Sequence, residues 1–280
     1  MFRQFASVLR TSFRGQKLVL VLNSTSRNHY RPLFATGVAF GLFSAATTSA
    51  IFLDAPSNFP PETSVSVDSS ISPFPTSLSP EVNPNLSQKY ALLGYGVRYV
   101  TFVSFKVYGI GVYIANSDIA KARRIVGEAL RSDPGSLADP EESAKVIAKL
   151  LDEKVQFAVR ICPVRNTDYS HLKDGLIKST LAHSLSKTNR DVVGAGLDEL
   201  RQVFLGRKGS VPKNHLLYLE VLKDGSLLVS YEDPKKAVVT PMGVVKEPMV
   251  GQILMLQYLS GRKPLSEELR RSCGEKLAVL

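Results

Sequence analysis

The pattern of apolar positions predicts strands in several parts of the chain. Residues 90–115, which include the stretch GVRYVTFVSFKVYGIGVYIA, are rich in β-branched and aromatic residues and predict two or more adjacent strands. Residues 154–161 predict another strand, and residues 216–233 predict a hairpin that turns at Asp224 and Gly225. We therefore expect a sheet that is mostly antiparallel.

Between and after these strands the apolar positions recur at helical spacing. Helices are predicted at residues 117–130, 139–153, 167–186 and 194–205, and residues 247–277 predict two more that are broken at Gly261 and Pro264. This order of elements lacks regular β-α-β alternation. It indicates an α+β fold.

The first 31 residues contain six basic residues and no acidic residue. Apolar residues recur there at helical spacing, with arginines elsewhere on the helical wheel, so the segment predicts a basic amphipathic helix. Such a helix, rich in Arg and Ser, is typical of a mitochondrial presequence. The alternative is a basic arm that binds nucleic acid or a membrane surface. No nucleic-acid motif follows the segment, so we expect import and no nucleic-acid partner.

Residues 33–53 form a run of 21 uncharged residues. As a helix this run would reach roughly 30 Å, the thickness of the hydrocarbon core of a bilayer. It predicts a transmembrane helix in the mitochondrial inner membrane, with the rest of the chain in the intermembrane space because the basic flank precedes it. The alternative is the sorting part of a longer, cleaved signal. Gly37 and Gly41 form a GxxxG pattern, which favours a homodimer.

Residues 54–88 contain seven Pro and nine Ser without any periodicity. Such a composition is typical of a disordered tether, because too little apolar surface is available to offset the entropy of ordering. The folded domain is therefore predicted at residues 89–280.

Common catalytic and metal-binding motifs are absent from the sequence. It contains no GxSxG, HExxH or phosphate-binding loop, and GAGLDE at residue 194 lacks the third glycine of a dinucleotide-binding motif. The four histidines include no i, i+4 pair. Cys162 and Cys273 are far apart and are expected to be buried thiols. Hydrolase and zinc-enzyme functions are therefore disfavoured.

The stretch at residues 96–115 contains one arginine, Arg98, and the pattern K-x-x-x-I-G-V-Y. Together with DYSHLKDGLIKSTLAHSL, the hairpin and the paired C-terminal helices, it makes residues 89–280 resemble the chalcone isomerase family. The resemblance implies an open-faced β-sandwich, in which a large antiparallel sheet packs against a layer of helices with a ligand cleft between them. The layout of presequence, membrane segment and tether also resembles a fungal branch of that family, the altered inheritance of mitochondria proteins.

The resemblance also assigns site residues. In plant members an arginine holds the phenolate of the substrate during an intramolecular ring closure, and Arg98 matches it; Tyr169 matches the helix tyrosine. Three further positions differ, since Tyr108 replaces a strand threonine, Leu176 a helix asparagine and Tyr258 a late threonine. Loss of these polar groups would cost orders of magnitude in rate, so we expect little or no chalcone isomerase activity.

A retained arginine and tyrosine in an otherwise apolar cleft suit an amphipathic anionic ligand. A fatty acid, as bound by the plastid branch, and haem both fit this description, and the fungal resemblance favours haem. Arg98, Tyr108 and Tyr169 are then the expected ligand-binding residues. His183 is the candidate axial ligand because Tyr169, Leu176 and His183 recur every seven residues and would share one helix face.

Each assignment has an alternative. Arg98 would otherwise belong to a structural ion pair, His183 would be an ordinary helix histidine, and the tyrosines would be core residues. For the whole protein, the alternatives to ligand binding are an active isomerase, or intramolecular lyase, with an unknown enone substrate and a structural scaffold with a vestigial cleft.

Overall fold

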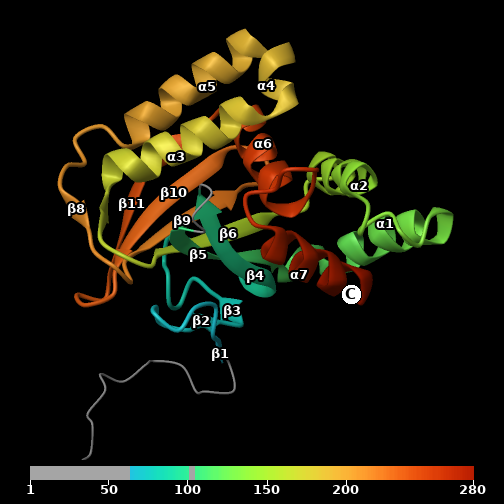
Figure 1. Cartoon of the computed structure of the whole chain (residues 1–280), viewed down its shortest axis with the longest axis horizontal. Coiled ribbons are helices and arrows are strands. Elements are labelled where there is room, and N and C mark those ends of the chain that lie inside the picture. Colours follow the sequence, from blue (N-terminus) through green and yellow to red (C-terminus); the bar gives the residue numbers. More distant parts are fainter. Residues whose placement is uncertain (1–63, 101–104) are drawn as a thin grey trace, which may run out of the picture. The chain divides into compact units, whose positions relative to one another are not determined.

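A seven-stranded antiparallel sheet lies at the centre of the computed structural model, which describes residues 64–100 and 105–280 (Figure 1). The strand order is β11-β10-β9-β6-β5-β4-β3. The strands are β3 (Ser77–Leu78), β4 (Tyr90–Val100), β5 (Phe105–Ala115), β6 (Phe157–Pro163), β9 (Leu216–Val221), β10 (Leu227–Asp233) and β11 (Val238–Val245). The predicted antiparallel sheet is confirmed.

The predicted hairpin turns where the sequence indicated. Gly225 has a φ of 89°, and the Asp224 carboxylate accepts a hydrogen bond of 2.9 Å from the Ser226 amide. Strand β11 was not predicted. It contains Pro241 and Gly243, which both weaken the sequence signal of a strand, and it pairs with β10 across a bulge between Val229 and Ser230.

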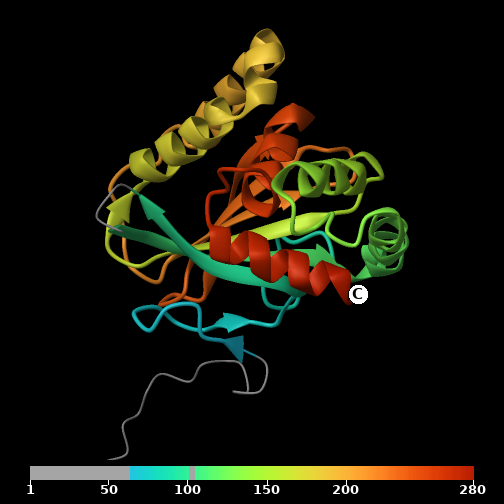
Figure 2. The same ribbon diagram turned by 45° about the vertical axis from the view of Figure 1, so that its right-hand side comes forward.

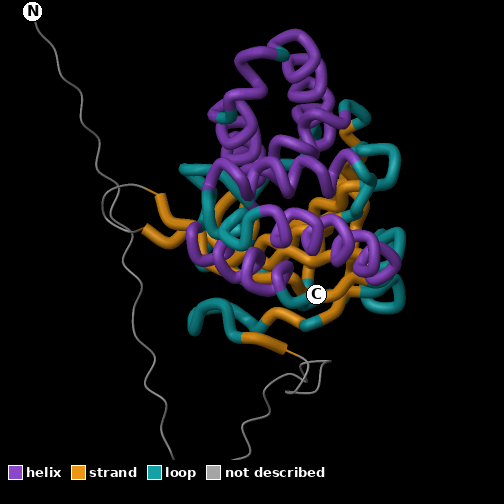
Figure 3. Tube along the Cα trace, turned by 90° about the vertical axis from the view of Figure 1, so that its right-hand side faces the viewer, coloured by secondary structure: helices purple, strands orange, loops and turns teal. Residues whose placement is uncertain are grey.

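Seven α-helices lie among the described residues, and the larger ones lie over one face of the sheet (Figures 1 and 2). They are α1 (Ile119–Ser132), α2 (Pro140–Asp152), α3 (Tyr169–Ala182), α4 (Ser184–Thr188), α5 (Arg190–Val203), α6 (Pro248–Leu259) and α7 (Glu267–Ala278). Figure 3 shows the same layers coloured by secondary structure. The predicted α+β class is therefore confirmed.

The sheet buries apolar side chains on both faces. Ile110, Val112 and Ile114 of β5 belong to the core shared with the helices, whereas Tyr113 between them belongs to a second core on the opposite face. This follows from the two-residue period of a strand. Burial of apolar surface on two faces explains why β5 reads as a nearly continuous apolar run.

The second core is covered by residues 64–88, here called the strap. The strap contains β1 (Ser64–Val65), β2 (Phe74–Pro75) and β3, which pairs with β4. Phe74 is fully buried and Leu78 is 4% exposed. The prediction of a disordered tether is therefore wrong for residues 64–88, because a few buried apolar side chains anchor a segment that is otherwise rich in Pro and Ser.

The remaining predictions for the N-terminal region lie outside the described residues. These are the presequence at 1–31, the transmembrane helix at 33–53 with Gly37 and Gly41, and the rest of the tether. Within residues 64–100 and 105–280, no helix is long and apolar enough to cross a membrane.

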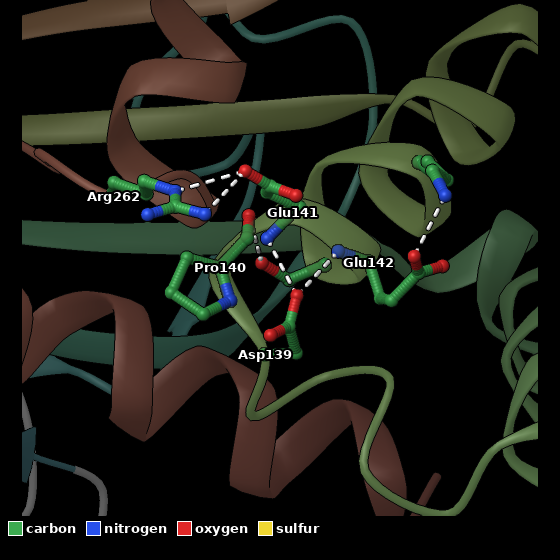
Figure 4. A network of polar contacts seen from close by, with 7 residues as sticks. Asp139, Pro140, Glu141, Glu142 and Arg262 are labelled. Carbon is green, nitrogen blue, oxygen red and sulfur yellow. Dashed lines mark hydrogen bonds and ion pairs between the residues drawn. The ribbon is translucent and has the colours of Figure 1, made fainter.

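The predicted break near Gly261 and Pro264 is confirmed by the loop between α6 and α7. This loop is tied to the start of α2 (Figure 4). Arg262 donates two hydrogen bonds to Glu141, of 2.6 and 2.9 Å, while the Asp139 carboxylate caps the helix by accepting from the amides of Glu141 and Glu142. The negative charge of this carboxylate also interacts favourably with the positive end of the helix dipole.

The helix predicted over residues 167–186 is interrupted. Helix α3 ends at Ala182, His183 has extended backbone angles (φ −75°, ψ 146°), and α4 starts at Ser184. The Ser186 hydroxyl donates to the Thr180 carbonyl across the break, which satisfies one of the carbonyls at the end of α3.

Candidate functional site

A cleft of about 640 Å³ lies between the ends of β4 and β5 and helix α3. Most of its lining surface is apolar, but the charged residues Arg98, Arg165, Asp168, Asp174 and Lys178 also line it. The residues that matter for its chemistry are Arg98, Val107, Tyr108, Leu172, Gly175 and Lys178. A concave, mostly apolar site with a small number of polar groups is the usual form of a small-molecule site.

Arg98 is half-buried and points from β4 toward the helices. It lies opposite Tyr108 in the ladder between β4 and β5. Its Nη1 donates to the Tyr108 hydroxyl at 2.7 Å and to Ser179 Oγ of α3 at 3.1 Å. None of the ion pairs among the described residues includes Arg98. In this part of the chain, the structural ion pair considered for Arg98 is therefore not formed.

The two hydrogen bonds leave one edge of the guanidinium available. Both come from Nη1, and within residues 64–100 and 105–280 neither Nε nor Nη2 has a hydrogen-bond partner. Nε and Nη2 carry the two parallel N–H groups that bind a carboxylate with two hydrogen bonds. Arg98 is therefore held in place, and none of the described residues bonds to its carboxylate-binding edge.

Helix α3 fixes this arrangement through Ser179. The Ser179 hydroxyl accepts from Arg98 and donates to the Gly175 carbonyl at 2.7 Å, and the Ser179 carbonyl accepts from Gln257 of α6 at 3.1 Å. These bonds connect β4, α3 and α6. Sequence analysis did not identify Ser179. Its spacing of three residues from Leu176 places it on a neighbouring part of the helix surface.

Two exposed cations, Arg165 and Lys178, lie at the rim of the cleft. The guanidinium of Arg165 lies 3.7 Å from the centre of the Phe105 ring. His171 is also exposed at the rim, and its Nδ1 lies 2.8 Å from the Asp168 carboxylate. The Ser170 hydroxyl and the His171 amide both donate to this carboxylate and lower the pKa of Asp168, so it stays charged.

The positions assigned by the family resemblance are only partly brought together. Tyr108 lines the cleft beside Arg98, and Leu176 is buried on α3. Tyr258 is fully buried on α6, and its hydroxyl forms no hydrogen bond with any residue that the structure describes. Burial raises the pKa of Tyr258 well above 10, so the hydroxyl stays neutral. Tyr169 is not among the residues that line the cleft; its ring packs against Tyr231, with ring centres 5.2 Å apart.

His183 is also not among the residues that line the cleft. Its Nδ1 accepts a hydrogen bond of 3.3 Å from the Leu185 amide at the start of α4. The expectation that His183 shares a helix face with Tyr169 and Leu176 is wrong, because α3 ends one residue before it. Burial lowers the pKa of His183, which favours the neutral ring that accepts this bond.

Thiol and metal chemistry find little support in the described part of the chain. Cys162 and Cys273 are both free and buried, as predicted, and burial raises the pKa of Cys162 to about 12. No group of three or more His, Cys, Asp or Glu side chains in residues 64–100 and 105–280 is arranged to hold a metal ion.

Comparison with known proteins adds to this geometry. A family model described as chalcone isomerase like matches residues 88–274. The protein named Altered inheritance of mitochondria protein 18, mitochondrial, of Debaryomyces hansenii is 59% identical over 223 residues, which cover 77% of this chain and 75% of that protein. Its namesake in Kluyveromyces lactis is 40% identical over 277 residues, covering 93% of this chain and 87% of that protein.

A solved structure shares the fold. The fatty-acid binding protein of Arabidopsis thaliana superposes with a TM-score of 0.53 and 17% sequence identity, covering 78% of this chain and 96% of that one. The family model covers most of the folded part of the chain, and the observed sheet with its layer of helices is the fold expected from the resemblance. This chain belongs to the chalcone isomerase-like family.

Proposed function

We propose that this protein binds an amphipathic carboxylate in the cleft and does not act as a chalcone isomerase. One observation carries the proposal: the half-buried Arg98 lines a cleft whose surface is largely apolar, and no residue in 64–100 or 105–280 bonds to its carboxylate-binding edge. A carboxylate bound there would form charge-assisted hydrogen bonds, while the apolar part of the ligand would occupy the cleft.

The other assigned positions argue against isomerase chemistry. Leu176 provides no polar group, the Tyr258 hydroxyl is buried with no hydrogen bond to the described residues, and Tyr169 packs on Tyr231 instead of lining the cleft. Orientation of a reacting phenolate and its enone requires several groups that converge on the substrate. Arg98 and Tyr108 are suited to hold an anion without supplying that set.

A long-chain fatty acid is the ligand class that we favour. It has one carboxylate for Arg98 and a flexible apolar chain for the cleft, and the Arabidopsis protein that shares the fold is described as a fatty-acid binding protein. Arg98, Arg165 and Lys178 outnumber the carboxylates Asp168 and Asp174 in the lining, so the cleft has a net positive charge that would attract an anion.

Haem is the second candidate, and the rim histidine is the observation that favours it. His171 lines the cleft, and its Nδ1 faces the Asp168 carboxylate, the usual partner of a metal-bound imidazole, which leaves Nε2 as the nitrogen to bind iron. Arg98 would hold a propionate. When bound, haem would supply a redox-active iron. His171 therefore replaces His183 as the proposed axial ligand.

The cellular setting is part of the same proposal. Relatives are named as mitochondrial proteins, and residues 1–31 have the pattern of a presequence. We propose a mitochondrial location in which residues 33–53 anchor the chain in the inner membrane, with the folded part in the intermembrane space. Dimerisation through Gly37 and Gly41 remains a prediction from the sequence.

The proposal is tested by titrating purified full-length protein with palmitate and with methyl palmitate, which lacks the charge. We expect palmitate to bind and Arg98→Gln to weaken it by about 10–100-fold, since hydrogen bonds to a charged group are worth about 1.5–3 kcal/mol. The matched control is Arg262→Gln, which removes an arginine bonded to Glu141 at the surface and should leave the affinity unchanged.

Equal palmitate affinity in the wild type and in Arg98→Gln would refute the role of Arg98, and absence of binding would refute the fatty-acid assignment. Haem is tested by adding haemin and recording the Soret band. We expect loss of the band in His171→Ala and not in His183→Ala; the reverse result would refute the new assignment. If a deletion of residues 33–53 abolishes a cellular phenotype that every cleft variant leaves unchanged, the scaffold alternative is favoured.

A further inference from the structure

Gly175 lies in the interior of α3 and lines the cleft. Apart from the backbone of α3 itself, a Cβ atom built on this residue would meet no atom of the described residues within 4 Å. Glycine is among the residues that most weaken a helix interior, because it has the largest backbone freedom to lose. The absence of a side chain here therefore weakens the helix, and no close packing against another described residue requires it.

Two other glycines of the described residues, Gly96 and Gly196, have a packing reason. A Cβ on Gly96 would lie 2.6 Å from the Leu269 amide nitrogen, and a Cβ on Gly196 would lie 2.6 Å from the Val250 side chain. At these positions only glycine allows the close approach of two elements. Gly175 differs because the space beside it is open, and because that space belongs to the cleft.

The open space at Gly175 is connected to the anion-binding group. The Ser179 hydroxyl donates to the Gly175 carbonyl, and the oxygen of this hydroxyl accepts a hydrogen bond from Arg98. Leu172, one helical turn earlier, and Val107 on β5 also line the cleft and give it apolar walls. A carboxylate held by Arg98 would therefore have the space at Gly175 close to its first carbons.

We propose that Gly175 is the specificity-determining residue of the cleft. The missing side chain leaves room for the hydrocarbon that adjoins the carboxylate of the ligand, so that a larger residue would enter the volume of the ligand. This inference rests on the proposed function and extends it, because it states where the apolar part of the acid lies.

The test uses the opposite effects expected on stability and on binding. In full-length protein, Gly175→Ala should raise the thermal midpoint by about 2–4 °C, because alanine favours the helix, and should weaken palmitate binding by about 3-fold or more. Gly175→Leu should weaken binding by about 30-fold or more. A purely structural role for Gly175 would not produce a more stable protein that binds less well.

Gly194→Ala is the matched control. Gly194 also lies inside a helix, α5, and also has nothing within 4 Å of its Cβ position, but it does not line the cleft. This substitution should raise the thermal midpoint similarly and leave palmitate affinity unchanged.

Three results would overturn the inference. If both Gly175 variants bind palmitate as the wild type does, the inference fails while the proposed function stands. If Gly175→Ala lowers the thermal midpoint, the glycine is structural. If the wild type itself does not bind palmitate, the proposed function fails first, and the inference falls with it.

Discussion

Two arginines project from opposite faces of the same sheet and meet different surroundings. Arg98 on β4 faces the helices beside a cleft, and one edge of its guanidinium has no bond to the described residues. Arg160 on β6 faces the strap and is 8% exposed. Its guanidinium lies 4.8 Å from the ring centre of Phe74 and 6.0 Å from that of Tyr218. In the described part of the chain, neither arginine forms an ion pair.

The difference between them lies in what covers each arginine. Aromatic faces stabilise the charge of Arg160 by cation–π attraction and fill the space around it, so its surroundings are those of a structural residue. Arg98 has polar anchors on one edge and an apolar hollow beside it. A positive charge in a sheet thus suits ligand binding only where no other segment of the protein has filled the adjoining space.

The largest expected effect is a loss of stability when the aromatic cover of Arg160 is removed. Phe74→Ala would remove the fully buried ring that packs on Arg160 and should lower the free energy of unfolding by about 3–5 kcal/mol. Urea denaturation measures this loss. Palmitate affinity should not change where the protein remains folded, because the strap and the cleft lie on opposite faces. A parallel loss of affinity would show that the two faces are coupled.

A smaller loss of stability is expected at low pH, where the Asp68 carboxylate of the strap becomes protonated. The hydrogen bond from Lys106 is the main cause that lowers the pKa of Asp68 to about 2, below its ordinary value of 3.8. The folded state therefore favours the charged carboxylate. This contribution is fully present above about pH 4 and is lost as the pH falls through 2, by up to about 2 kcal/mol.

The contribution of Asp68 is isolated by measuring the free energy of unfolding as a function of pH in the wild type and in Asp68→Asn. The variant should be less stable near pH 6, and the difference should shrink as the pH falls toward 2. A difference that is constant with pH would show that the Lys106 contact does not hold the strap.

The smallest expected effect separates two buried tyrosines on β5. Tyr108→Phe removes an acceptor for Arg98 and should weaken palmitate binding by about 5-fold, equivalent to about 1 kcal/mol. Tyr113→Phe removes the hydrogen bond of 2.9 Å to the Pro75 carbonyl of the strap. It should cost about 1 kcal/mol of stability and leave binding unchanged. Equal effects of both variants on binding would remove the distinction between the faces.

Much of the fold could be predicted because its signals are local. The apolar run at 90–115 gave β4 and β5, and Asp224 with Gly225 marked the hairpin turn. The strap could not be recognised in the same way. Its anchors, Phe74 and Leu78, have no regular spacing, and they matter only because β4, β5 and β6 present a second apolar face to them.

The candidate site was predictable at Arg98 and less so around it. The placement of His183 assumed an unbroken helix, but no Gly or Pro marks the break after Ala182. The family resemblance placed Tyr169 at the ligand, whereas Tyr169 packs on Tyr231 and its close neighbour His171 lines the cleft. Which side of a helix faces a cleft depends on packing between distant segments, and the local sequence does not encode it.

Helix α7 packs so closely on β4 that a Cβ on Gly94 or Gly96 would lie within 3 Å of α7 atoms. The Glu268 carboxylate also accepts from the Val97 amide, immediately before Arg98. The last helix of the chain therefore acts as a fixed support for the strand that carries the anion-binding group. A purification tag should therefore not be attached directly to the end of α7. Deletion of α7 should displace the Arg98 guanidinium, even though no residue of α7 lines the cleft.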